Sequence, residues 1–294
     1  MKRLSRLKRK KQKKMIIVSV LSLLLFLCVG YAAFQTNLSI IAKGNIKQKK
    51  GYEILQELCN TETGDGLYKD ISENNRCIYK GSNPDNYIIF NNEIWRILSV
   101  EADKTIKIIK NESIDNMSWD MSGSSYWSRP SDLNSYLNNE YLDTITTNQD
   151  KIVNYSWNIG KIKIYGNEDF FEQINNEKQI QTNAKIGLIS ATEYIRTNSN
   201  NIMCGNFMLN EANFSECINT NWVYSMAQGS QFWTISVVEY LNGPSARAIS
   251  INSVGMLEER LSKNPCSIFP VTYLSSEITL SGNGTEQTPY TITN

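Results

Sequence analysis

The first clear pattern along the chain is an apolar run over residues 15–34, MIIVSVLSLLLFLCVGYAAF, which contains no charged residue. As an α-helix, these 20 residues span about 30 Å, the thickness of the hydrocarbon core of a bilayer. Residues 1–14 carry nine Lys or Arg and no acid. Because positive flanks stay in the cytoplasm, the pattern predicts a transmembrane helix with a cytoplasmic N-terminus. A buried core helix is the weaker alternative, since soluble helices rarely begin at so abrupt a charge boundary.

The sequence leaves open whether this segment is retained or removed. Gly30-Tyr31-Ala32 offers small residues at the spacing of a signal-peptidase site, but the apolar run is longer than a usual signal core. Cys28 follows the bulky Leu27, which is a poor match to a lipoprotein cleavage site. We expect a retained signal anchor and a protein of the cell membrane. If the segment is cleaved, the protein is secreted.

Beyond the apolar run, the pattern is that of a folded domain outside the cell. Residues 35–50 are expected to form a short connector. Residues 51–294 contain no internal repeat and no Pro- or Gly-rich linker, and they are numerous enough for one large domain. From Tyr87, alternation of period two predicts three strands joined by tight turns, at residues 87–90, 93–101 and 105–110.

Helical and strand patterns then follow one another without regular order. Helices are expected at residues 131–141, after Pro130, and at residues 168–178. Ser190 and Glu193 have the spacing of a capping box, in which Glu193 reaches back to the helix start. Further strands are expected at 185–189, 232–238, 246–252, 254–260, 268–275 and 277–281. This mixture predicts the α+β class with antiparallel sheets, short helices and long loops.

Charge is divided unevenly along the chain. Nine of the 30 basic residues lie in residues 1–14, which leaves 21 basic against 29 acidic residues in residues 35–294, a net charge of −8. A nucleic-acid-binding domain needs a basic face, so that class is disfavoured. The chain contains no His, which excludes Ser-His-Asp triads, Cys-His pairs and His-ligated metal sites.

Five cysteines lie in the exported part, where an oxidising environment favours disulfides. Cys204 and Cys217 would close one polar loop, and Cys59 and Cys77 would close another. Unpaired thiols are the alternative reading. Since five is an odd number, at least one cysteine is left over, and Cys266 is the expected free thiol.

Several segments resemble an exported domain family of low-GC Gram-positive bacteria whose function is not assigned. The resemblance covers residues 66–294 and begins with GLYKD at residues 66–70, followed by the stretch at 76–110. The later segments, in the same order, are LNSYLN (133–138), GLISATEYIR (187–196), CGNF…C…NTNWVY (204–224), FWTIS (232–236) and VTYLSSEITLSGNGTEQTPYTI (271–292).

That family is in turn similar to the C-type-lectin-like fold of the sulfatase-modifying (formylglycine-generating) enzymes. The resemblance implies C-type-lectin-like mixed antiparallel sheets after one N-terminal transmembrane helix. Two departures matter. Phe269-Pro270 stands where family members tend to have Arg-Pro, and the closely spaced cysteine pair that holds copper in the oxidases has no counterpart here. We therefore expect no metal and no cofactor.

Aromatic residues in polar segments are the candidate ligand-binding residues. They are Trp119, Tyr126, Trp127, Asn221, Trp222 and Tyr224, from loops expected around 112–130 and 197–231. A flat apolar ring can pack on a sugar while Asn and Ser supply hydrogen bonds. The alternative is that the tryptophans fill the core beneath long loops, as we expect for Trp95 and Trp233.

Catalytic chemistry has weaker support, and no catalytic residue is assigned. Carboxylate pairs such as Glu168 with Asp169 or Glu239 could serve glycoside hydrolysis, but 29 acids make chance pairs common. No lectin-type calcium motif and no EF-hand loop occurs. The leading hypothesis is a membrane-anchored recognition module, not an enzyme, that binds a surface glycan, a wall polymer or a surface protein. The alternatives are a structural or matrix-associated subunit and, with less support, an enzyme acting on wall sugars.

Overall fold

The computed structural model describes residues 14–15, 18–25, 48–129, 131–164, 169–199, 204 and 214–293. The chain divides into two units, residues 1–48 and 49–294. In the first unit, residues 14–15 and 18–25 are helical. Among the described residues, no helix has both the length and the apolar character needed to cross a bilayer. Residues 16–17 and 26–34 of the predicted membrane segment lie outside the described residues, as do residues 1–13 and 35–47.

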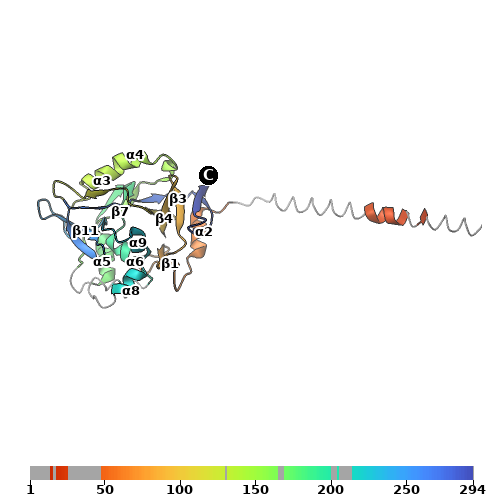
Figure 1. Cartoon of the computed structure of the whole chain (residues 1–294), viewed down its shortest axis with the longest axis horizontal. Coiled ribbons are helices and arrows are strands. Elements are labelled where there is room, and N and C mark those ends of the chain that lie inside the picture. The colour runs from red at the N-terminus through yellow and green to blue at the C-terminus, as the bar shows by residue number, and fades with distance from the viewer. Residues whose placement is uncertain are drawn as a thin grey trace, which may run out of the picture. The chain divides into compact units, whose positions relative to one another are not determined.

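The second unit is a mixed α+β domain with several sheets and short helices (Figure 1). Its largest sheet has nine strands, which are β1 (Gly66–Lys69), β2 (Cys77–Lys80), β3 (Tyr87–Phe90), β4 (Glu93–Val100), β5 (Ile106–Lys110), β9 (Ile186–Gly187), β14 (Val271–Leu274), β15 (Thr279–Ser281) and β16 (Tyr290–Thr293). The order is β15-β16-β3-β4-β5-β14-β9, and β2 joins β1 to β4. All pairs are antiparallel except β16 with β3.

Two smaller sheets complete the domain. The five-stranded sheet has the order β12-β11-β10-β13-β6, and its strands are β6 (Asn116–Ser118), β10 (Phe232–Trp233), β11 (Arg247–Ile251), β12 (Leu257–Leu261) and β13 (Pro265–Ser267). A separate ribbon pairs β7 (Tyr155–Asn158) with β8 (Gln181–Ala184) in antiparallel register.

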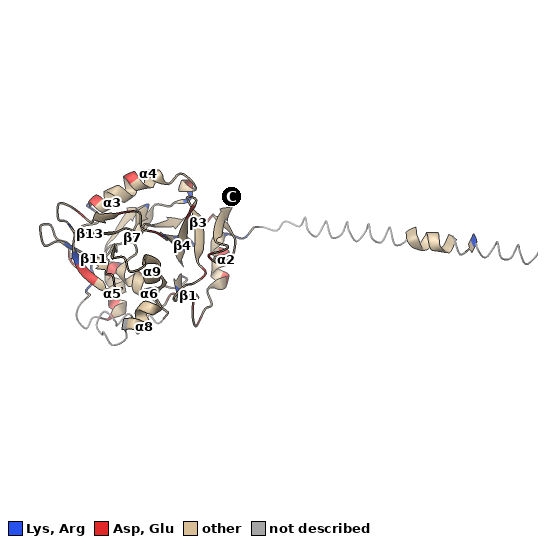
Figure 2. Ribbon diagram, in the orientation of Figure 1, with Lys and Arg blue, Asp and Glu red and all other residues tan. Residues whose placement is uncertain are grey.

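The helices are short. They are α2 (Gly51–Leu58), α3 (Asp132–Tyr136), the π-helix η1 (Leu137–Tyr141), α4 (Leu142–Thr144), the 3-10 helix η2 (Gln149–Lys151), α5 (Phe170–Glu177), α6 (Ala191–Arg196), α8 (Phe214–Asn219) and α9 (Trp222–Ala227). In Figure 1, α3 and α4 lie at one end of the domain and α8 at the opposite end. Figure 2 shows acidic residues on α2, α3, α4 and α5, in keeping with the net negative charge of this part of the chain.

The core contains all six tryptophans, each at most 2 % exposed. Trp119 contacts Trp127 and Trp233 with ring centroids 5.2 and 5.8 Å apart. Trp157 of the ribbon packs on the main sheet at Gly187, where a Cβ atom would lie 2.7 Å from the indole ring. Only glycine allows this close approach, so the two sheets meet at that position.

Many of the elements expected from the sequence are present. The strands at 87–90, 93–101 and 105–110 form β3, β4 and β5. The helix expected at 131–141 is present with Ser131 as its N-cap, and the one at 168–178 is present as α5 with Asp169 as its N-cap.

Three expectations need correction. The loop expected around 112–130 contains β6, and the loop expected around 197–231 contains α8 and α9 within its described part. The strand expected at 232–238 is short, and residues 234–236 instead exchange backbone hydrogen bonds with Ile189 and Ile249 in an irregular arrangement.

Candidate functional site

The structure places three predicted ligand-binding tryptophans in the core. Trp119 and Trp127 are fully buried, and Trp222 is 1 % exposed. The Trp222 Nε1–H donates a hydrogen bond to the Tyr79 carbonyl at 2.9 Å. The expectation that these rings lie on exposed loops is therefore wrong, because adjacent elements enclose them on all sides. From these positions they cannot offer a flat face to a ligand.

Asn221 is also buried and has a structural role, at 3 % exposure. It caps α9, since its Oδ1 accepts from the Tyr224 N–H at 3.1 Å while its Nδ2 donates to the Tyr194 carbonyl at 2.8 Å. Tyr224 is half-buried, and its hydroxyl donates to the Ser253 carbonyl. Tyr126 is half-buried too and stacks on Tyr240 at 5.0 Å.

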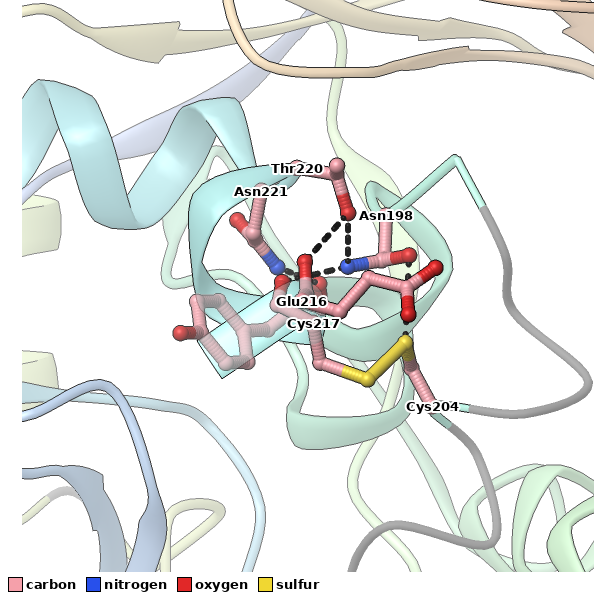
Figure 3. The surroundings of a disulfide bond; sticks show 7 residues. Asn198, Cys204, Glu216, Cys217, Thr220 and Asn221 are labelled. Atoms are coloured by element: carbon pink, nitrogen blue, oxygen red, sulfur yellow. Dashed lines mark hydrogen bonds between the residues drawn. A yellow bond between two sulfur atoms is a disulfide. The ribbon is translucent and has the colours of Figure 1, made fainter. Parts of the chain in front are cut away.

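Both expected disulfides are formed. Cys59 pairs with Cys77 and Cys204 with Cys217, and Cys266 is a buried free thiol. Figure 3 shows the second disulfide beside Asn198, whose Nδ2 donates to the Cys217 carbonyl and, at 2.9 Å, to the Thr220 hydroxyl. Asn198 thus links Cys217, which lies in α8, to Thr220, which directly precedes the N-cap of α9.

The main candidate site is a pocket of about 500 Å³ that lies elsewhere. Its walls come from the β7–β8 ribbon, from α5 and α6, and from the ends of β4, β5 and β14. Charged, carboxamide and aromatic side chains line most of it. None of the six residues predicted to bind a ligand lines this pocket, although Ser190 and Glu193 of the predicted capping box do.

Arg76 is the centre of the buried charge network in one wall of the pocket. Its side chain is 4 % exposed and pairs with Asp70, with Glu101 at 2.7 Å and with Glu193 at 2.5 Å. Its Nη2 also donates to the Ser99 hydroxyl at 3.0 Å. Burial alone would lower the pKa of Arg76, but the three carboxylates raise it above its usual value.

Glu193 connects this network to the main sheet. Its second oxygen accepts from the Lys107 ammonium at 2.6 Å, and that ammonium lies about 5 Å from the rings of Trp157 and Tyr273. Burial would raise the pKa of Glu193, but Lys107 and Arg76 lower it to about 2. The carboxylate is therefore ionised at any working pH.

The capping-box prediction is confirmed for Ser190 and wrong for the Glu193 side chain. The Ser190 hydroxyl does accept from the Glu193 backbone N–H at 3.2 Å. The Glu193 side chain, however, turns to Arg76 and Lys107 instead of the helix start. Its partners lie 117 and 86 residues away, so no local pattern could have indicated them.

Glu177, at the end of α5, forms a second polar centre. Its carboxylate is 3 % exposed and accepts from the hydroxyls of Ser190, Thr192 and Ser236. The backbone N–H of Thr192 donates as well, at 3.5 Å, so the carboxylate lies at the start of α6. Among the described residues, Glu177 makes no ion pair.

The β7–β8 ribbon supplies the exposed side of the pocket. Tyr155 stacks on Tyr273 with ring centroids 3.7 Å apart. Burial, followed by Glu101 and Asp103, raises the pKa of the Tyr155 phenol, so it stays neutral. Asn154, Gln181 and Asn183 are exposed here, and the Gln181 Nε2 donates to the side-chain Oδ1 of Asn158 at 2.9 Å.

Neither the comparison with known proteins nor the arrangement of possible metal ligands assigns a function to this pocket. The sequence matches no protein-family model and no curated protein, and the structure matches no solved structure. No group of three or more acidic or Cys side chains that could hold a metal ion occurs in the part of the chain that the structure describes. What the domain offers is a polar pocket whose charged residues are held in fixed positions.

Proposed function

We propose that this chain is a membrane-anchored, extracytoplasmic recognition module that binds the carbohydrate of a surface glycan or wall polymer. The pocket beside the β7–β8 ribbon is the observation that carries the proposal. Its volume of about 500 Å³ falls in the range of small-ligand sites, about 300–1,000 Å³. A protein partner would more commonly need a broad, flat surface.

The lining of the pocket suits a sugar. Tyr155 provides an aromatic ring, which packs on the C–H face of a pyranose. Asn154, Asn158, Gln181 and Asn183 provide amides that can both donate to and accept from hydroxyl groups. The site thus combines one ring with several neutral hydrogen-bonding groups.

The remaining parts of the proposal rest on the sequence. The apolar run at 15–34 and the basic residues before it support a single-pass anchor with the domain outside. The two disulfides fit an oxidising exterior. We also propose a C-type-lectin-like arrangement for the α+β domain, on the resemblance of residues 66–294 described above.

Binding is better supported than hydrolysis at this pocket. Glycoside hydrolysis needs one carboxylic acid that is still protonated and a second carboxylate nearby. Ion pairs lower the pKa of Glu193 to about 2, so it cannot deliver a proton. Glu101 is paired with Arg76, and Glu177 already accepts from three hydroxyls. These contacts support a recognition role.

The test is binding of the full chain, oxidised and held in detergent micelles, to arrayed glycans, purified cell wall and whole cells, with calcium and with EDTA. We expect saturable binding to at least one glycan. The substitutions Gln181→Ala and Tyr155→Ala should weaken it by roughly tenfold or more, as the loss of one good contact does. Gln179→Ala is the matched control, because Gln179 is exposed nearby but does not line the pocket.

Three outcomes separate the alternatives. Binding that Gln181→Ala and Tyr155→Ala leave unchanged would move the site away from this pocket. Loss of binding in EDTA would point to a calcium-dependent site. A folded sample that binds no glycan but assembles as its concentration rises would favour the structural-subunit alternative. Trp222→Ala is unsuitable as a probe, because this ring lies in the core.

A further inference from the structure

The cations that line the pocket are already paired. Four basic side chains contribute to it, and each contacts a carboxylate. The ion pairs are Arg76–Glu101, Lys107–Glu193, Arg196–Asp70 and Lys178–Glu73, with N–O distances of 2.7, 2.6, 2.8 and 3.3 Å. A ligand phosphate or carboxylate could recruit one of these cations only by separating it from its partner.

The acids that line the pocket outnumber these cations. Five carboxylates contribute to it, and two of them, Asp103 and Glu177, make no ion pair among the described residues. Asp103 is exposed and accepts from the backbone N–H and the hydroxyl of Thr105 at 3.0 and 2.7 Å. The neighbouring Lys104 does not neutralise it, since that ammonium lies 5.0 Å from the Tyr52 ring, outside the pocket.

The charge balance therefore selects among ligands. An anion would meet a net negative lining, and it could recruit Arg76, Lys107 or Arg196 only by breaking a buried ion pair, which carries a large desolvation cost. Lys178 is easier to reach, because its pair with Glu73 is partly exposed, but Glu73 adds its own negative charge beside it. A cation that binds at Asp103 meets excess carboxylate and breaks no ion pair. We propose that the ligand of this pocket is a carbohydrate with a protonated amino group, and that anionic polymers are rejected. This inference rests on the proposed function and specifies its ligand class.

Asp103 and Glu73 are the residues that would receive the amine. Both line the pocket and are open to solvent, unlike the buried Glu101, Glu177 and Glu193. One Glu73 oxygen contacts Lys178, but the Glu73 and Lys178 side chains are 37 % and 31 % exposed. Water screens an ion pair that is this exposed, so the pair contributes little free energy. The neutral Tyr155 ring lines the same pocket as Asp103, and an aromatic face attracts an ammonium.

The test compares three oligosaccharides on the full chain in detergent micelles, at about pH 6, where the amine is protonated. The probes are a glucosamine tetramer, its fully N-acetylated counterpart and a sulfated oligosaccharide of the same length. We expect the glucosamine tetramer to bind about tenfold more tightly than the acetylated one. The sulfated oligosaccharide should not bind measurably.

Variants of single acidic residues show which side chains cause the preference for the protonated amine. Asp103→Asn keeps the contact with Thr105 and should reduce the preference for the amine to about twofold, without weakening the acetylated tetramer. Glu73→Gln should reduce it in part. Asp143→Asn is the matched control, because Asp143 is an exposed acid on α4 that does not line the pocket.

Different results would contradict the charge selection, its assignment to this pocket and the proposed function itself. Equal or tighter binding of the acetylated or the sulfated oligosaccharide would overturn the charge selection and leave the proposed recognition role intact. A preference that survives both Asp103→Asn and Glu73→Gln would overturn its assignment to this pocket. If the chain binds no glycan in any format, the proposed function itself fails.

Discussion

The substitution Glu193→Gln tests whether the charge network holds the domain together. Glutamine has nearly the same shape, but it removes the charge that Arg76 and Lys107 share. Arg76 keeps Asp70 and Glu101, whereas Lys107 loses the carboxylate that contacts it. Since both cations are less than 10 % exposed, water replaces the lost partner only in part.

Removing one partner of a buried ion pair costs about 3–5 kcal/mol, because the remaining charge stays desolvated. For a domain of this size, that corresponds to a fall in Tm of roughly 6–20 °C. The control is Glu57→Gln, which removes the partner of Lys49 in a pair that is 62 % and 56 % exposed. An exposed pair contributes about 0–1 kcal/mol, so the control should change stability little.

Urea unfolding followed by tryptophan fluorescence measures both variants in the full chain. All six tryptophans lie between Trp95 and Trp233, so the signal reports on the second unit alone. A loss below about 1 kcal/mol for Glu193→Gln, or a loss equal to that of Glu57→Gln, would refute the reasoning.

The pH dependence of the free energy of unfolding gives a second test of the ion pairs of Glu193. The pKa of Glu193 is lowered from 4.5 to about 2, so its contribution is complete above about pH 4.5 and disappears as pH falls toward 2. The wild-type chain should therefore lose its advantage over Glu193→Gln across this interval. A difference between the two that stays constant down to about pH 2 would show that the ion pairs do not stabilise the fold.

Three further outcomes are expected. Trp222→Ala should cost about 3–5 kcal/mol in urea unfolding, since it empties core space and leaves the Tyr79 carbonyl without its donor, and a cost below about 1 kcal/mol would contradict its burial. Replacing both Cys59 and Cys77 by Ser should cost about 3 kcal/mol in the same assay, because their disulfide closes a loop with a sequence separation of 18. Burial raises the pKa of the Cys266 thiol to about 12, so mass spectrometry should detect iodoacetamide labelling at about pH 8 only after unfolding; rapid labelling of the native chain would contradict this.

Local features of the fold were predictable from the sequence. Period-two alternation identified β3, β4 and β5, and the helix expected after Pro130 is present, with Ser131 as the N-cap of α3. The two disulfides followed from cysteine spacing and the expected compartment. Each of these depends on residues close together in the chain or on composition, which a single sequence displays directly.

The candidate site could not be predicted in the same way. Lys107 occupies a strand that is buried on both faces, so alternation wrongly suggests a solvent-facing residue. Glu193 is explained locally as a helix cap, yet its side chain has distant partners. Aromatic residues in polar segments suggested exposure, but Trp119 packs on both Trp127 and Trp233, and all three rings are buried. Tertiary packing decided each case.

The buried charge network is better explained by its place in the wall of the pocket than by a contribution to the stability of the fold. Replacing buried ion pairs with apolar side chains is often neutral or stabilising, so a stable fold does not require Arg76 and its carboxylates. What an apolar replacement could not keep is the wall of the pocket, where Arg76 fixes Glu101 and Glu193 in place. An apolar replacement of Arg76, Lys107, Glu101 and Glu193 together leaves Asp70 paired with Arg196 and strands no buried charge. It should therefore keep the fold better than Glu193→Gln does, while it removes the charge pattern of the pocket. Undiminished affinity of such a variant for the glucosamine tetramer would show that the network serves folding alone.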